Sequence, residues 1–201
     1  NGLTRSVEQA WGYVKSLDTS LNDIRIVTGK SADEMANFAV QANNAAKELG
    51  KTTTDYTDAA LIYAQQGLSD EEIEARTNIT LKTANVTGES TEKVSEQLTA
   101  IWNGYKVDAS EAEVYVDRLA AVAATTASDL GELAVGMSKV ASAAAAMGVG
   151  EDQLAAQLST IISVTKQAPE SVGSALRTVY ARISDIKAGI DEDGATLGNY
   201  S

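Results

Sequence analysis

Histidine and cysteine are both missing from this chain of 201 residues. Without cysteine there are no disulfides and no thiolate ligands, and the redox compartment stays undetermined. Without histidine the chain lacks the usual general base and the commonest transition-metal ligand. We therefore expect no enzyme, no metal and no cofactor. Catalysis by a pair of carboxylates across a cleft is the alternative that stays open, although nearly all acidic pairs fall where helices are expected to begin.

Clusters of basic residues are also missing. The chain has 16 Lys and Arg against 28 Asp and Glu, a formal net charge of -12. Nucleic-acid binding needs clustered positive charge that neutralises phosphates, so we expect no sequence-specific nucleic-acid binding. The acids of residues 51–100 are dispersed over helix starts and outer faces. They predict a solvated surface, and an acid-lined binding surface is the alternative.

Long apolar runs and proline are scarce as well. The longest uncharged stretch is residues 153–165, and both it and residues 140–150 are shorter than the roughly 20 apolar residues that a membrane-spanning helix needs. One proline, few aromatic residues and abundant alanine favour helix. The composition therefore predicts a helical protein without a conventional transmembrane segment.

Apolar residues recur at spacings of three and four along the whole chain, which is the period of an α-helix. We find no strand pattern and no repeat of fixed period. Nine helices are predicted, with apolar stripes at residues 7–24, 35–49, 56–63, 73–84, 94–105, 115–126, 130–147, 154–165 and 172–190.

The expected helix ends carry recognisable signals. Three capping boxes are predicted, at Ser31 with Glu34, Ser69 with Glu72 and Ser110 with Glu113. Ser128 or Asp129 begins the seventh helix, and Pro169 occupies a favoured first-turn position in the ninth. Glycines follow several helices, as left-handed C-terminal caps do. Four of them are candidate hinges: Gly50, Gly67, Gly88 and Gly148.

These signals predict an all-α fold, a compact multi-helix bundle or an array of helical hairpins with about nine helices and no β-sheet. Residues 1–50 form an N-terminal helical pair, whose first helix has a heptad-like stripe that is able to continue upstream as a coiled coil. A boundary near Gly50–Thr54 leads into a core helical domain over residues 51–190. Residues 191–201 form a loose acidic tail.

Small residues recur at every fourth position of the seventh predicted helix, at Ala134, Ser138, Ser142 and Ala146. This spacing lets two helix backbones approach closely. A tightly packed interior helix explains it, and an interface that repacks between copies or against lipid is the alternative. The two tryptophans, Trp11 and Trp102, lie on or beside apolar stripes, and we expect both to anchor the core.

Several segments resemble, in order, the core region of phage tail tape measure proteins. That core begins with a helix ending in Glu-Leu-Gly followed by a threonine-rich turn, as residues 48–54 do here. Residues 17–18 and 24–29 are similar to what precedes the core in tape measures of phages and prophages of Gram-positive bacteria. The resembling core segments are residues 45–56, 66–72, 84–88, 94–103, 124–133, 147–149 and 172–183.

The resemblance implies a structural virion protein that sets tail length and supports tail assembly and DNA ejection. It implies a location in the tail lumen of the virion, and in the host cytoplasm during assembly. The implied partners are the tail tube protein, tail assembly chaperones, distal tail or tip proteins and further copies of the chain. The family has no catalytic motif to transfer to this sequence.

A membrane-active helical module that aids DNA passage through the host envelope is the alternative function. The small-residue helix is the feature that would support it, through contacts with membrane only at ejection.

Overall fold

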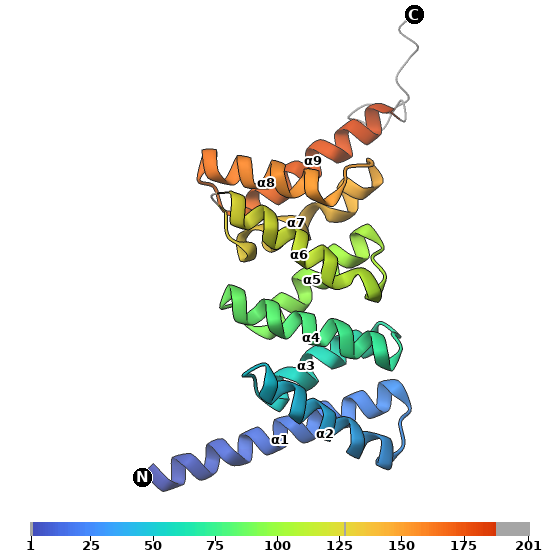
Figure 1. Ribbon diagram of the computed structural model, residues 1–201, viewed down its shortest axis with the longest axis vertical. Helices are drawn as coiled ribbons and strands as arrows, with labels where there is room; N and C mark the ends of the chain where they lie inside the picture. The colour runs from blue at the N-terminus through green and yellow to red at the C-terminus, as the bar shows by residue number, and fades with distance from the viewer. Residues whose placement is uncertain (1, 127, 188–201) are drawn as a thin grey trace, which may run out of the picture. The chain divides into compact units, whose positions relative to one another are not determined.

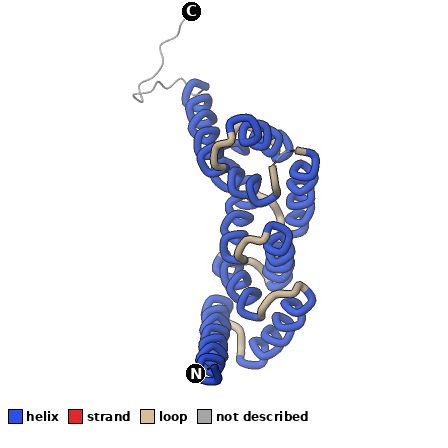
Figure 2. The backbone as a smooth tube through the Cα atoms, turned by 90° about the vertical axis from the view of Figure 1, so that its left-hand side faces the viewer, coloured by secondary structure: helices blue, strands red, loops and turns tan. Residues whose placement is uncertain are grey.

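The computed structural model describes residues 2–126 and 128–187. Within these residues the chain is helical, with nine α-helices, one turn of 3₁₀ helix and no strand, which confirms the predicted all-α class (Figures 1 and 2). The predicted tail, residues 191–201, lies outside the described residues. The elements are α1 (Gly2–Thr28), α2 (Ala32–Glu48), α3 (Thr53–Gln65), α4 (Asp70–Thr87), α5 (Thr91–Tyr105), η1 (Ala109–Glu111), α6 (Ala112–Thr125), α7 (Leu130–Ala146), α8 (Glu151–Thr165) and α9 (Pro169–Lys187).

The contacts divide the chain into two compact units, residues 1–95 and 96–201. The first unit holds α1 to α4 and the start of α5, and the second holds the rest of α5 and all later elements. This division falls within α5, whereas the sequence predicts a boundary near Gly50–Thr54. The predicted division into residues 1–50, 51–190 and 191–201 stays a prediction.

Helix α3 is the centre of the first unit and packs against α1, α2 and α4. Its Tyr63 is fully buried, as are Ile24 of α1 and Leu81 of α4. Polar contacts join the same helices: the Ser20 hydroxyl of α1 donates to the Asp58 carboxylate of α3. Helices α2, α3 and α4 thus share one core with part of the long helix α1.

Helix α7 is the corresponding centre of the second unit and packs against α6, α8 and α9. Ten of its residues are buried, including Leu133, Met137 and Val140. Leu154 and Leu158 of α8 contribute fully buried side chains to the same core. The seventh predicted helix is therefore an interior helix of its unit.

Most predicted helix starts are confirmed in atomic detail. The capping boxes at Ser31 with Glu34 and at Ser69 with Glu72 are both formed. Asp129, rather than Ser128, caps α7 and forms a box with Glu132. Each cap satisfies backbone N–H groups that the first helical turn leaves without partners.

The third predicted capping box is wrong. Asp108 has extended backbone, the turn η1 begins at Ala109, and α6 follows at Ala112. The residue before α6, Glu111, makes no side-chain capping bond. Ser110 therefore lies inside a turn that has already begun, where its side chain has no free first-turn N–H group to accept from.

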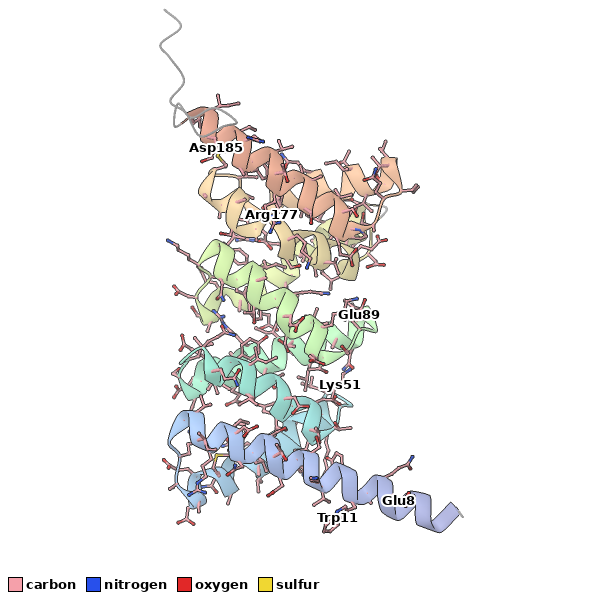
Figure 3. All side chains as sticks on the ribbon, turned by 180° about the vertical axis from the view of Figure 1, so that it is seen from behind. Glu8, Trp11, Lys51, Glu89, Arg177 and Asp185 are labelled. Atoms are coloured by element: carbon pink, nitrogen blue, oxygen red, sulfur yellow. The ribbon has the colours of Figure 1, made fainter. Side chains whose placement is uncertain are left out.

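The two tryptophans have opposite environments. Trp102 of α5 is 1% exposed, which confirms it as a core residue, but Trp11 of α1 is 73% exposed. The prediction for Trp11 is wrong because the N-terminal part of α1 runs past the other helices of its unit (Figures 1 and 3). An apolar stripe shows that a helix has an apolar face, but it does not show that a neighbouring helix covers that face.

Candidate functional site

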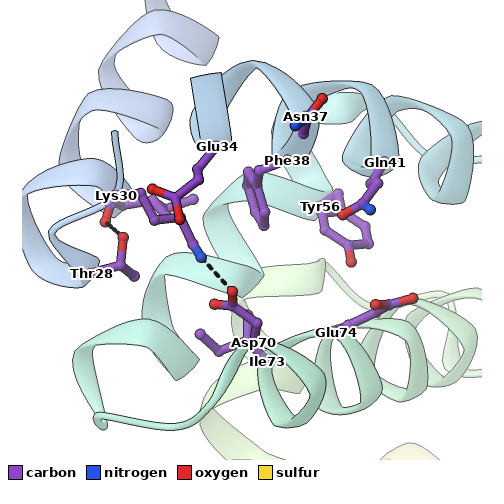
Figure 4. Close-up of a pocket in the computed structure, with 11 residues that line it drawn as sticks. Thr28, Lys30, Glu34, Asn37, Phe38, Gln41, Tyr56, Asp70, Ile73 and Glu74 are labelled. Atoms are coloured by element: carbon purple, nitrogen blue, oxygen red, sulfur yellow. Dashed lines mark hydrogen bonds and ion pairs between the residues drawn. The ribbon is translucent and has the colours of Figure 1, made fainter. Parts of the chain in front are cut away.

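A pocket with a volume of about 220 Å³ lies among α1, α2, α3 and α4 of the first unit (Figure 4). Its walls combine apolar and aromatic side chains with carboxylates and amides. A few polar groups around an apolar wall are typical of binding pockets. The lining residues are Ile24, Thr28, Lys30, Glu34, Asn37, Phe38, Gln41, Tyr56, Asp70, Ile73 and Glu74.

Helix caps place the two aromatic residues of this pocket. Thr52 caps α3 and forms a box with Asp55, so that Tyr56 stands one turn into the helix. The box at Ser31 begins α2, which carries Phe38 two turns on. The ring centroids of Phe38 and Tyr56 lie 6.3 Å apart with the planes tilted by 58°, a favourable aromatic geometry. The two rings form one wall of the pocket.

Charges around the pocket are mostly negative. The Lys30 ammonium pairs with the Asp70 carboxylate, which closes one end (Figure 4). Hydrogen bonds from the Ser31 backbone and then its hydroxyl lower the pKa of Glu34, and the positive charge of Lys30 contributes less. Glu74 lies near the other end. Burial, and then the negative charge of Glu74, raise the pKa of Tyr56 to about 12.

A second hollow of about 370 Å³ continues from the pocket between α2 and α4. The two hollows share Gln41 and Glu74, and we call their combined surface the α2/α4 groove. Asn78 lines the second hollow, and its side-chain oxygen is buried without a hydrogen-bond partner among the described residues. The further lining residues of the second hollow are Asn44, Ala45, Glu48, Leu49 and Lys82.

The second unit contains a different polar feature, a buried acid. Glu151 is 5% exposed at the start of α8, and neither carboxylate oxygen has a hydrogen-bond partner among the described residues. The Arg118 guanidinium of α6 lies 4.0 Å away. Burial raises the pKa of Glu151 to about 8; the negative charge of Asp152 acts in the same direction and Arg118 opposes both. Burial in the folded chain therefore favours the protonated form of this acid.

Tyrosines surround this acid. Burial, then the negative charge of Glu151, raise the pKa of Tyr105, and the Tyr105 hydroxyl is also buried without a partner. The rings of Tyr105 and Tyr115 lie 6.2 Å apart, and the Arg118 guanidinium lies 5.6 Å from the Tyr115 ring centroid. Tyr180 of α9 donates to Gln157 of α8. Sequence reasoning missed this cluster, since its members are far apart along the chain.

The four small residues singled out on α7 do not share one environment. Ala134 is buried and Ser138 is half-buried, whereas Ser142 and Ala146 are exposed. The Ser138 hydroxyl donates to the Val135 carbonyl of its own helix. A step of four residues exceeds the 3.6 residues of one helical turn, so a stripe with this spacing rotates around the helix. Its role as an interface stays a prediction.

The closest backbone approaches involve glycines of α5, α7 and α9. A Cβ atom built on Gly173 of α9 would stand 2.3 Å from the Gly136 carbonyl oxygen of α7. A Cβ on Gly104 of α5 would stand 2.7 Å from the Ser142 backbone nitrogen. Helices α5 and α9 therefore approach the backbone of α7 closely. Isolated glycines within the predicted helices are the sequence signal that points to these crossings.

The four candidate hinge glycines all follow helices and all have left-handed backbone. Their φ angles are 65° at Gly50, 75° at Gly67, 71° at Gly88 and 76° at Gly148. A Cβ atom at any of the four would meet nothing within 4 Å, so the requirement for glycine comes from the backbone angle alone. Movement at these positions stays a prediction.

Two searches of the described residues bear on other kinds of site. They contain no group of three or more acidic side chains arranged to hold a metal ion. Among the helices described, none combines the length and apolar character needed to cross a bilayer.

Over the described residues the fold defines a class of protein, an all-helical protein whose main features are closely packed helices and the polar α2/α4 groove. A family model described as phage-related minor tail protein matches residues 43–198, and the chain belongs to this family. It is a phage tail protein, and the family associates it with the virion. No curated protein and no solved structure gives a significant match to the chain.

Proposed function

We propose that this chain is the core of a tail tape measure protein, which sets tail length and supports tail assembly and DNA ejection. The match to the minor tail protein family over residues 43–198 carries the proposal. The segments that resemble tape measures occur in order over the same residues. Helix also suits a length gauge, because each helical residue adds a constant rise of about 1.5 Å.

Tail length is the measurement that tests this role. In the full-length protein, residues 151–187 and residues 96–187 are deleted separately, and tails are measured by electron microscopy. A segment that acts as an extended helical gauge shortens the tail in proportion to its residues, by about 55 Å and about 140 Å respectively. Tails of unchanged length for both deletions would contradict a measuring role for the second unit.

The conformation in the tail is a separate part of the proposal. As isolated, the chain folds into compact units, and it opens at Gly50, Gly67, Gly88 and Gly148 to fit the tube. Small-angle scattering and circular dichroism of the isolated chain test the first half. A rod-like particle that unfolds without cooperativity would contradict compact units in solution.

The proposed partners are the tail tube protein, the assembly chaperones, distal tail or tip proteins and further copies of this chain. For copies the supporting surface is the N-terminal part of α1, where Trp11 is 73% and Val14 is 56% exposed. Val7, Ala10, Val14 and Leu17 follow a heptad spacing in the sequence. We place the contact between copies on this stripe.

Cysteine cross-linking tests that contact, since the native chain contains no cysteine. Under mild oxidation Val14→Cys is expected to give a disulfide-linked dimer. Gln9→Cys, exposed on another side of the same helix, is the control and should stay monomeric. Equal cross-linking of the two variants would indicate random collision and would remove α1 as the contact between copies.

A further inference from the structure

The α2/α4 groove has features that the proposed structural role does not use. Tyr56 is 3% exposed, yet no described residue makes a hydrogen bond with its hydroxyl. Figure 4 shows this hydroxyl at the pocket, directed toward the side that carries Glu74. The hydroxyl opens onto the cavity, so its available partner is water or a ligand that enters the cavity. Here the open cavity is the place where a partner fits.

Charge indicates the sign of that partner. Glu34, Glu48, Asp70 and Glu74 line the groove, against Lys30 and Lys82. Lys30 is already paired with Asp70 at one end. Glu74 is exposed, and its negative charge contributes to the raised pKa of Tyr56. A positive group placed beside these two residues would pair with the Glu74 charge and would give the Tyr56 hydroxyl a hydrogen-bond partner.

The walls indicate the shape of the partner. The Phe38 and Tyr56 rings offer faces to a cation, and such contacts favour arginine over lysine. A planar guanidinium has five N–H donors for the acceptors that line the groove, and no acceptor of its own. The available acceptors are the Glu74 carboxylate, the Tyr56 hydroxyl oxygen and the side-chain oxygen of Gln41. A volume of about 220 Å³ suits one long side chain.

We propose that the α2/α4 groove binds a basic segment of a partner protein, with one arginine side chain in the pocket between Phe38, Tyr56 and Glu74. The guanidinium lies against the aromatic wall and donates to Glu74 and to the Tyr56 hydroxyl oxygen. The rest of the segment follows the second hollow along Asn78.

Titration with the tripeptide acetyl-Gly-Arg-Gly-amide tests the site on the whole chain, followed by NMR of ¹⁵N-labelled protein. The expected result is a saturable shift of the amide signals of residues 38, 56 and 74, in the millimolar range that suits a single side chain. The peptide with citrulline in place of arginine keeps the shape and lacks the charge, and it should not bind.

Two variants locate the contact. Glu74→Gln is expected to weaken binding about fivefold, as loss of an exposed ion pair does. Tyr56→Phe removes only the unpartnered hydroxyl and should weaken binding about twofold without loss of stability. Glu71→Gln removes the same charge from the same helix outside the groove and is the matched control. Equal weakening by Glu71→Gln and Glu74→Gln, or no shift with the arginine peptide, would overturn the proposal.

Discussion

Helices α4 and α7 are both core helices of their units, but they are buried in opposite ways. Helix α4 buries Arg76 and three threonines, Thr77, Thr80 and Thr83, beside its apolar residues. Helix α7 buries glycine, alanine and large aliphatic residues and no charged side chain among those described. Both helices are thus deeply buried, α4 with many polar side chains and α7 with mostly apolar ones.

The difference lies in how each helix deals with its backbone and its polar groups. On α4, Thr83 donates to the Ile79 carbonyl at 2.8 Å, and Thr80 shares a 2.5 Å hydrogen bond with Tyr63 of α3. On α7, Gly136 brings the backbone into contact with Gly173 of α9. Helix α4 therefore depends on hydrogen bonds of hydroxyls such as those of Thr80 and Thr83, and α7 depends on the absence of side-chain atoms at Gly136.

The largest expected effect is at the α7–α9 crossing. Gly173→Ala places a methyl group 2.3 Å from the Gly136 oxygen, so the two helices must separate, and we expect a loss of about 3 kcal/mol in the free energy of unfolding. Gly12→Ala, on α1 with nothing within 4 Å, is the control and should be neutral or slightly stabilising. Urea unfolding measures both. A neutral Gly173→Ala would show that α7 does not need its close approach.

Next in size is the buried acid of α8, a helix that packs on α7. The pKa of Glu151 is raised from 4.5 to about 8 in the folded chain, so its contribution to stability is present below pH 4.5 and is lost as pH rises through about 8. Glu151→Gln cannot ionise. We expect it to match the native chain at pH 5 and to exceed its free energy of unfolding by about 2.5 kcal/mol at pH 7.

Urea midpoints at several pH values measure this difference. A constant gap between Glu151→Gln and the native chain, from pH 5 to pH 9, would show that the native carboxyl does not titrate on unfolding. Asp117→Asn, an exposed acid that is not among the charges acting on Glu151, serves as the control for a change in net charge.

The threonines of α4 give a pair of opposite, smaller effects. Thr80→Val removes the bond to Tyr63 and should cost about 1 kcal/mol. Thr77→Val replaces a hydroxyl that is buried without a partner among the described residues, and should stabilise by up to about 1 kcal/mol. Thermal unfolding of the two variants compares them. The same sign for both would show that hydrogen bonding does not distinguish these positions.

The smallest effect should be the same in both helices. Ser69 caps α4 and Asp129 caps α7, each within a complete capping box. Ser69→Ala and Asp129→Ala should each cost about 0.5 kcal/mol, because the bonds lost are to exposed backbone N–H groups in both cases. Circular dichroism melts report the loss. A much larger cost in one helix would mean that its cap also supports tertiary contacts.

Local signals predicted most of the fold. Apolar spacing and caps located nine helices, since both act over a single turn or two. The prediction failed at Ser110, where a turn already begun at Ala109 leaves nothing to cap, and at Trp11, which no neighbouring helix of its unit covers. Both failures concern what lies next to a residue in space.

The candidate sites were less accessible to prediction than the helices. The groove is lined from three different helices, which carry Phe38, Tyr56 and Glu74. No residue spacing within a single helix therefore predicts it. The sequence shows Glu151 only as an acid in the first turn of a helix, where a negative charge is favoured by the helix dipole. Its burial in the tertiary structure is the main cause of its raised pKa.

The sequence by itself determined the helical class, the positions where helices begin and end, and the lack of histidine and thiol chemistry. These follow from backbone hydrogen bonding and side-chain period, which act locally. The tertiary structure decided which glycines meet, which hydroxyls find partners, and which carboxylates remain charged. Those outcomes depend on the distance between helices, and packing alone sets that distance.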